Sequence, residues 1–229
     1  IKKSKKPMIV LGQSIFTLKS GKYIFESIKS FLIKNKKITS DWNSLNVISE
    51  DASSIGSLDL GIYYTEDGSN KILSNLENHY YDIVYLLGQD SLNFKKKDEF
   101  IIYQGSHGDK GAEIADIILP GAAYTEQNGY FTNLEGKLQK AYKASYPPGE
   151  AKEDWTIINK LSEHINKKKL FSDRNQLESS MMNYLNLFFE KNNTKDFVSD
   201  LNSEFINELV QIKNNDYYYS NSIARASKT

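Results

Sequence analysis

Four short runs of apolar residues constrain the fold of this chain more than any other feature of its sequence. Within each run the apolar residues follow one another without alternating with polar ones. This pattern is typical of strands in a parallel sheet that is covered on both faces. The runs are PMIVL at 7–11, DIVYLL at 82–87, FIIY at 100–103 and DIIL at 116–119. The sequence therefore predicts a mostly parallel β-sheet.

Helical patterns lie between these runs. Ser20 is a residue type favoured at helix N-caps, and the apolar residues after it fall on one helical stripe, namely Ile24, Ile28, Phe31 and Leu32. A second short helix is expected near residues 70–79, just before the second run. Strands that alternate with helices indicate right-handed crossovers. The predicted fold class is α/β, with a Rossmann-like, mostly parallel sheet and flanking helices.

A Pro-Pro-Gly break at residues 147–149 precedes a more helical region. Three amphipathic stripes follow it: Trp155, Ile158, Leu161 and Ile165; Leu177, Met181, Leu185 and Phe188; and Leu201, Phe205, Leu209 and Ile212. Asp173 and Gln176 resemble a capping box at the start of the second of these helices. Residues 214–229 show no periodicity and are expected to form an extended tail. We therefore predict an α/β domain over residues 1–166 and a helical extension with a tail over residues 167–229.

The composition excludes several kinds of site. The 229 residues include 29 Lys and Arg, 29 Asp and Glu, and no Cys. The balanced charge gives no reason to expect nucleic acid or an anionic membrane as a partner. Without cysteine, this chain can form no disulfide, thiolate metal site or thiolate-bound iron–sulfur cluster. No apolar run approaches the roughly 20 residues that a membrane-spanning helix needs.

Glycine-containing loops follow three of the predicted strands, where open α/β sheets bind ligands. Gly12 follows the first strand, but its surroundings lack the G-x-G-x-x-G spacing of a dinucleotide site, so an ordinary turn is favoured. His107 and Asp109 fit either a metal or proton-transfer pair or, as we favour, a structural loop. Glu126 and Glu135 could serve acid–base chemistry, although structural hydrogen bonding is favoured for both.

The central part of the chain resembles a known family. The segments IIYQGSHGDKGAEIADIILPGAAYTEQNGYFTNLEGKLQKA and PPGEAKEDWTIINKLSE are similar to the large iron–sulfur (75-kilodalton) subunits of mitochondrial respiratory complex I, the NADH:ubiquinone oxidoreductase. KKPMIVLG, DWNSLNVI and SIARASKT fit other parts of those subunits. The resemblance is strong over residues 101–163 and weak over residues 167–216. That family is in turn related to the molybdopterin-dependent oxidoreductases, so the resemblance implies a molybdopterin oxidoreductase-like domain.

In the related enzymes, the glycine-rich loop and the Thr-Asn-x-Glu-Gly segment would help to frame a bis-pterin cofactor. The resemblance implies that this chain keeps only a vestige of that cradle, with the candidate residues Gly105, His107, Gly108, Thr132, Asn133, Glu135 and Gly136. No bound cofactor, no metal and no catalytic residue is expected in this chain. The family's iron–sulfur clusters are bound by Cys and His in an amino-terminal half that has no counterpart here.

The resemblance implies a non-catalytic structural portion of the large subunit, which supports electron transfer from NADH to ubiquinone by bracing the cluster-bearing half. The expected location is the matrix-facing arm of complex I at the mitochondrial inner membrane. Expected partners are the iron–sulfur half and other matrix-arm subunits, with no nucleic acid and no direct membrane span. The amphipathic helices and Tyr217–Tyr219 would be docking surfaces, or else the helices form a self-contained core. The alternatives are a cofactor-binding fragment of an active molybdopterin-dependent oxidoreductase and a separate nucleotide-binding protein.

Overall fold

The computed structural model of the chain describes residues 1–49, 54–62, 68–90, 92, 94–193, 203–209 and 218–227. The chain forms two compact units, each assembled from three separate segments. The first unit contains Ile1–Gly61, Thr132–Leu138 and Tyr184–Lys213, and the second contains Ile62–Phe131, Gln139–Asn183 and Asn214–Thr229. The predicted boundary between residues 166 and 167 stays a prediction.

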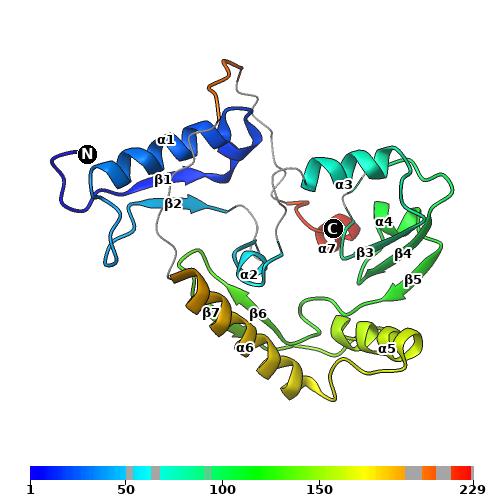
Figure 1. Cartoon of the computed structure of the whole chain (residues 1–229). Helices are drawn as coiled ribbons and strands as arrows, with labels where there is room; N and C mark the ends of the chain where they lie inside the picture. Colours follow the sequence, from blue (N-terminus) through cyan, green and yellow to red (C-terminus); the bar gives the residue numbers. More distant parts are fainter. Residues whose placement is uncertain are drawn as a thin grey trace. The chain divides into compact units, whose positions relative to one another are not determined.

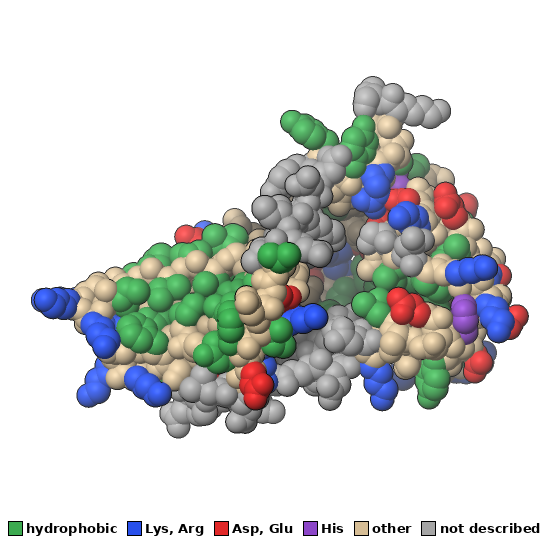
Figure 2. Space-filling model, turned by 90° about the horizontal axis from the view of Figure 1, so that it is seen from above, with side chains coloured by type: hydrophobic (Ala, Val, Ile, Leu, Met, Phe, Trp, Pro, Cys, Tyr) green, Lys and Arg blue, Asp and Glu red, His purple; other side chains and the backbone are tan. Residues whose placement is uncertain are grey.

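The first unit contains a small parallel sheet. Strand β1 (Ile9–Gly12) pairs in parallel with β2 (Leu45–Ile48), and the 3-10 helix η1 (Gln13–Thr17) and helix α1 (Gly21–Lys34) connect them (Figure 1). Gly12 ends β1 in an ordinary strand-to-helix turn, as expected. Helix α2 (Ser54–Asp59) follows β2. The sequence patterns did not predict β2, because Asn46 interrupts its apolar run. Figure 2 shows hydrophobic side chains gathered over α1.

Ser20 is the N-cap residue of α1, as predicted, but its side chain caps no helical N–H. Its hydroxyl donates to the carbonyl of Ile206 and accepts from the N–H of Ile206, both at 2.7 Å. The Phe205 ring also contacts Tyr23, with ring centroids 5.9 Å apart. The helix predicted over residues 201–212 is therefore wrong for residues 203–209, which have no helical structure because Ile206 bonds to a side chain. The remaining residues of that prediction lie outside the described residues.

The second unit contains a three-stranded parallel sheet in the order β3-β4-β5. These strands are β3 (Ile83–Leu87), β4 (Phe100–Gly105) and β5 (Ile117–Pro120), and all three coincide with predicted apolar runs. Helix α3 (Gly68–Glu77) precedes β3 as predicted, and the short helix α4 (Lys110–Glu113) connects β4 to β5. The α/β fold with parallel sheets and flanking helices is thus confirmed.

One face of this sheet forms a hydrophobic core. Its buried members come from α3, β3 and β4: Leu76, Val84, Leu86, Ile101 and Tyr103. The register pairs Val84 with Ile101 and Leu86 with Tyr103, so that these four side chains share one face. Residues of α4 and of the segments just after it, together with residues before and after β3, pack against the same cluster: Ala112, Ile114, Ala115, Tyr81, Leu92 and Phe94.

The opposite face of the sheet carries exposed apolar side chains. They are Ile83, Leu87, Phe100 and Ile117, which are 65%, 51%, 44% and 44% exposed. We call these four residues the apolar second face. The continuous apolar runs predicted a sheet covered on both faces, but the structure leaves this part of the second face open.

The remaining elements of the fold follow β5. They are β6 (Gly129–Thr132), β7 (Leu138–Ala141), α5 (Asp154–Asn166), α6 (Arg174–Asn193) and α7 (Ser222–Ala226), with β6 and β7 forming a two-stranded sheet. Helices α5 and α6 were predicted. The expected extended tail is wrong in part, because Asn221 caps the short helix α7 by accepting from the Ala224 N–H at 2.9 Å. Among the helices of the described residues, none is long and apolar enough to cross a membrane.

The predicted capping box at the start of α6 is present in a modified form. The Asp173 carboxylate accepts from the Gln176 N–H at 2.9 Å, as a capping residue does. The Gln176 side chain accepts from the N–H of Ser172 at 2.6 Å, one residue before the position that the motif predicts. Arg174 then fixes the start of α6 through Glu153, at 2.6 Å, and Glu178, at 2.9 Å.

A buried carboxylate connects α3 to the start of β4. The Glu99 side chain accepts from the Lys97 N–H at 2.8 Å, and its Oε1 lies 2.5 Å from His79 Nδ1. The hydrogen bond from the Lys97 N–H is the main cause that lowers the pKa of Glu99 from 4.5 to about 2, and the contact with His79 lowers it further.

This carboxylate should make the stability of the chain depend on acid pH. Because the pKa of Glu99 is lower in the folded state, its ionised form stabilises the fold above pH 4.5, and this contribution is lost as the pH falls from about 4.5 to about 2. Glu99→Gln is expected to lower the urea midpoint at pH 7 and to flatten its pH dependence in that window. Glu113→Gln removes an exposed carboxylate and is the control. A parallel, undiminished pH dependence in Glu99→Gln would contradict this assignment.

Candidate functional site

A polar cavity of about 330 Å³ lies at the carboxyl ends of β4 and β5. Open α/β sheets bind ligands beyond the carboxyl ends of their strands, and the sequence places glycine-containing loops at this position. Its lining comes from the loops after both strands and from the segment before α5: Ser106, His107, Pro120, Gly121, Glu126, Pro148, Glu150 and Ala151.

His107 lines this cavity, whereas Asp109 has structural partners. His107 Nδ1 lies 3.0 Å from Ser106 Oγ. The Asp109 side chain accepts from the Lys110 N–H at 2.8 Å, which caps α4, and its other oxygen accepts from Arg225 Nε. The Arg225 hydrogen bond is the main cause that lowers the pKa of Asp109. Asp109 therefore serves the fold, and the described residues contain no group of three or more His, Asp or Glu placed to hold a metal ion.

The Tyr103 side chain fills the space beneath the glycine-rich loop. Its ring is 2% exposed, and its hydroxyl donates to the His107 carbonyl at 2.9 Å. A Cβ atom on Gly105 would collide with this ring, and one on Gly111 would lie 2.6 Å from the Gln89 carbonyl oxygen. Gly108 is different, because the nearest atom to a Cβ placed there would be 3.9 Å away. The packing of the protein itself therefore accounts for glycine at 105 and 111, but not at 108.

The acidic side chains around the cavity disfavour an anionic ligand. Glu126 accepts from the Ala123 N–H at 3.0 Å, the kind of structural hydrogen bond that the sequence analysis favoured. Glu150 also lines the cavity, and its carboxylate is 4.0 Å from Lys152 Nζ. With two acidic residues in its lining, the cavity offers little electrostatic attraction to a phosphate or another anion.

A buried polar network lies beside this cavity. Gln104, which is fully buried in β4, donates to Asp154 Oδ1 at 2.8 Å, and its Oε1 accepts from the Tyr85 hydroxyl. Gln127 donates to the other Asp154 oxygen at 3.2 Å. A Cβ on Gly121 would lie 2.8 Å from Asp154 Oδ1, so the carboxylate needs a glycine there. This network attaches the first turn of α5 to the centre of the sheet.

The other group of predicted cradle residues forms a turn in the first unit. Asn133 Oδ1 accepts from the N–H groups of Glu135, at 3.0 Å, and Lys137, at 2.9 Å. Gly136 has φ +78°, a conformation that favours glycine. Thr132 is 2% exposed and hydrogen-bonds the Asp59 side chain; burial raises the pKa of Asp59. The Thr-Asn-x-Glu-Gly signature thus closes the connection between β6 and β7.

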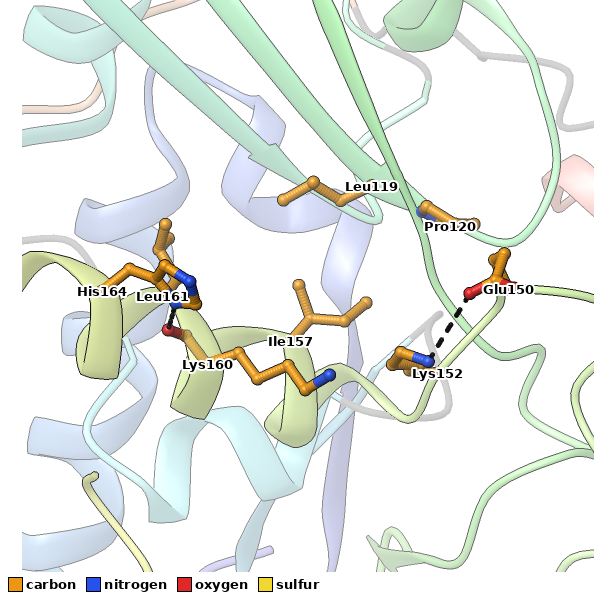
Figure 3. A pocket seen from close by; sticks show the side chains of 8 residues that line it. All are labelled: Leu119, Pro120, Glu150, Lys152, Ile157, Lys160, Leu161 and His164. Atoms are coloured by element: carbon orange, nitrogen blue, oxygen red, sulfur yellow. Dashed lines mark hydrogen bonds and ion pairs between the residues drawn. The ribbon is translucent and has the colours of Figure 1, made fainter. Parts of the chain in front are cut away.

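A second, apolar cavity of about 280 Å³ lies between β5 and α5 (Figure 3). Leu119, Ile157 and Leu161 provide its hydrophobic walls, with Lys152, Lys160 and His164 around them. Figure 3 shows that the Lys160 carbonyl bonds to the His164 ring, at 2.9 Å, within α5. Because the surface of this cavity is almost entirely apolar, it is suited to binding apolar groups.

Sequence patterns missed the residues that organise the carboxyl edge of the sheet. Gln104, Asp154 and Arg225 come from distant parts of the chain, and no local spacing connects them. One signal was available: Arg174 and Arg225 are the only arginines, and each joins two carboxylates. All other basic residues of this chain are lysines. Each arginine is therefore a candidate for bonding two carboxylates through different guanidinium nitrogens, which the single ammonium group of Lys does less specifically.

Comparison with known proteins gives a consistent result. The sequence model of the family described as Molybdopterin oxidoreductase matches residues 1–164. The chain is 40% identical to the NADH-ubiquinone oxidoreductase 75 kDa subunit of Reclinomonas americana, over 99% of this chain and 34% of that protein. It is 40% identical to the mitochondrial 78 kDa subunit of Candida albicans, over 74% of this chain and 23% of that protein.

A bacterial relative shows the same relationship. The chain is 35% identical to an NADH-quinone oxidoreductase subunit of Rickettsia bellii, over 100% of this chain and 33% of that protein. The chain thus spans about a third or less of the length of these relatives. It is homologous to the carboxyl-terminal part of the complex I 75/78 kDa subunit and of its bacterial counterpart. With its parallel sheets and a family match over residues 1–164, the chain belongs to the molybdopterin oxidoreductase family.

Proposed function

We propose that this chain is a non-catalytic structural portion of the large iron–sulfur subunit of respiratory complex I. In this role it braces the cluster-bearing half of the subunit in the matrix-facing arm at the mitochondrial inner membrane. Electron transfer depends on the positions and surroundings of the clusters, so a rigid support contributes to function without chemistry of its own. Its partners are that iron–sulfur half and other subunits of the arm.

The apolar second face carries this proposal. Parallel sheets are almost always covered on both faces. Ile83 and Phe100 are paired in the register, and Ile117 lies on the same face near Phe100, so these three exposed apolar side chains are neighbours, whereas Leu87 lies at the other end of β3. Contiguous apolar surface on a folded protein marks interaction sites. The sheet itself therefore offers an apolar surface to which a partner could bind.

The carboxyl edge of the sheet does not fit the anionic pterin cofactor of the family's enzymes. Tyr103 fills the space beneath the loop, and the acidic residues Glu126 and Glu150 are part of the cavity lining. The arginine nearest to this edge, Arg225, is already paired with Asp90 and Asp109. We therefore propose that Gly105, His107 and Gly108, together with the turn at residues 132–136, are a vestige of a cofactor cradle. Because this chain contains no cysteine, we also propose that the iron–sulfur clusters of the subunit are bound by residues outside it.

Polar substitution of the apolar second face should impair assembly without unfolding the chain. Ile83→Thr combined with Ile117→Thr keeps two β-branched residues in the strands and is expected to leave stability within about 0.5 kcal/mol, because both side chains are substantially exposed. The amount of chain that migrates with complex I on native gels should fall several-fold. The matched control is Ile118→Thr, which is 54% exposed on the same strand but on the opposite face.

Two results would contradict the proposed function. The first is that the double variant loses stability while the same amount of chain still migrates with complex I on native gels. That result would mean that this chain's own residues, and not a partner, cover the apolar second face. Stoichiometric molybdenum or tungsten bound through this chain in the purified complex would favour the alternative, a cofactor-binding fragment of an active molybdopterin-dependent oxidoreductase. The family match over residues 1–164 is the observation that keeps this alternative in view.

A further inference from the structure

Two aspartates meet one arginine at the carboxyl edge of the three-stranded sheet. Asp90 lies shortly after β3 and Asp109 shortly after β4. Arg225 Nη2 lies 3.0 Å from Asp90 Oδ1, and Arg225 Nε donates to Asp109 Oδ2. The third nitrogen, Nη1, donates to the Tyr219 carbonyl at 3.0 Å. Every nitrogen of the guanidinium group therefore has an acceptor within the second unit.

The two carboxylates are partly shielded from solvent, which strengthens their interaction with the arginine. The side chains of Asp90, Asp109 and Arg225 are 13%, 21% and 29% exposed. Charge-assisted bonds from one planar fork to two acceptors are more directional than a bond from a lysine ammonium. Without Arg225, the negative charges of Asp90 and Asp109 would repel each other, and a bound cation would reduce this repulsion.

The segment that carries Arg225 is shaped for this contact. Asn221 accepts from the Ala224 N–H at 2.9 Å and begins α7, and the Arg225 N–H then bonds to the Asn221 carbonyl at 3.0 Å. The Tyr219 carbonyl, which lies before α7, accepts a hydrogen bond from the Arg225 side chain of that helix. Residues 218–227 therefore form a small loop-and-helix unit closed around its own arginine.

We propose that Asp90 and Asp109 form a guanidinium-binding site at the carboxyl edge of the sheet, and that residues 218–227 are its ligand within the same chain. Related folds bind phosphates at this edge of the sheet, whereas here the edge binds a cation. Residues 218–227, which we call the strap, supply that cation as Arg225 and cover the edge. This inference deepens the proposed structural function, because it explains how the edge is sealed. The proposed function is tested by co-migration with complex I, whereas this site is tested by hydrogen exchange in residues 218–227. Either proposal can therefore fail without the other.

Hydrogen exchange in the full chain tests the site. In Arg225→Ala, amide protection of residues 218–227 is expected to fall at least tenfold, while β3 and β4 stay protected. Asp90→Asn, which keeps the side-chain size and removes one ion pair, should give a smaller loss in the same residues. Arg225→Lys should restore protection only in part, since an ammonium group lacks the fork. Arg174→Ala is the control, because it releases the start of α6 and should leave residues 218–227 unchanged.

A chemical rescue identifies the ligand class. Added methylguanidinium is expected to bind Arg225→Ala with a dissociation constant in the millimolar range. NMR shifts of residues around Asp90 and Asp109 measure this binding. The Arg225→Ala/Asp90→Asn double variant should bind methylguanidinium at least tenfold more weakly. Inorganic phosphate should bind neither. Unchanged protection in Arg225→Ala, equal protection with Lys at position 225, or phosphate binding at this edge would overturn the proposal. If Arg225→Ala unfolds the sheet, the test rests on hydrogen exchange in Asp90→Asn. A loss of amide protection confined to residues 218–227 of that variant supports the site, and unchanged protection there contradicts it.

Discussion

Gln104→Ala is expected to lower the free energy of unfolding by about 2–4 kcal/mol. Gln104 is fully buried, and its amide joins Tyr85 of β3 to Asp154 of α5. Removal of the side chain leaves the Tyr85 hydroxyl and one Asp154 oxygen without this partner, and it also opens a cavity in the sheet. Each unsatisfied buried group costs about 1–3 kcal/mol, so the two losses together exceed the effect of most substitutions. Urea denaturation followed by circular dichroism measures the change.

Gln139→Ala provides the matched control for this experiment. Gln139 is exposed on β7, and the same substitution there is expected to change stability by no more than about 0.5 kcal/mol. In Gln104→Ala, hydrogen exchange should also increase in the first turn of α5, because Asp154 loses its attachment to β4 while it keeps the bond from Gln127. Equal stability of the two variants would show that the network does not contribute to the fold.

The strands and helices with strong periodic patterns could be predicted from the sequence. The runs that became β1, β3, β4 and β5 are continuous and apolar, and α5 has a clear amphipathic stripe, whereas that of α6 is weak. Strand β2 was missed because Asn46 interrupts its apolar run, whereas the helix predicted over residues 201–212 failed at residues 203–209 because a distant contact overrides the local pattern. Residues 203–209 have helical spacing, but Ile206 forms its backbone hydrogen bonds with Ser20.

The location of the candidate site could also be predicted, although its chemistry could not. The rule that ligands lie at the carboxyl ends of parallel strands leads directly to Ser106 and His107. The acidic character of this edge depends on residues such as Glu150 and Asp90, and no local sequence pattern places either of them there. The resemblance to a cofactor-binding family pointed to glycines at 105 and 108, whereas the packing of Tyr103 explains why 105 and 111 must be glycine.

Gly111→Ala is expected to destabilise the second unit by about 2 kcal/mol, within the range of about 1–3 kcal/mol that is typical of overpacked cores. A Cβ atom at this position would lie 2.6 Å from the Gln89 carbonyl oxygen and 2.9 Å from a ring carbon of Tyr103. Neither atom can move cheaply, because one belongs to the backbone and the other to a side chain that is 2% exposed. The melting temperature should fall by roughly 4–8 °C, given about 2–4 °C per kcal/mol for a chain of this size.

Gly108→Ala separates the packing explanation from a general need for glycine in this loop. The nearest atom to a Cβ at position 108 is 3.9 Å away, which is ordinary contact, so the melting temperature should stay within about 2 °C of the wild-type value. A large loss of stability in Gly108→Ala, or none in Gly111→Ala, would contradict the packing argument. If both outcomes are as expected, the loop is built around the Tyr103 ring and the fold does not require glycine at position 108, which would support the proposal that this loop is a vestige of a cofactor cradle.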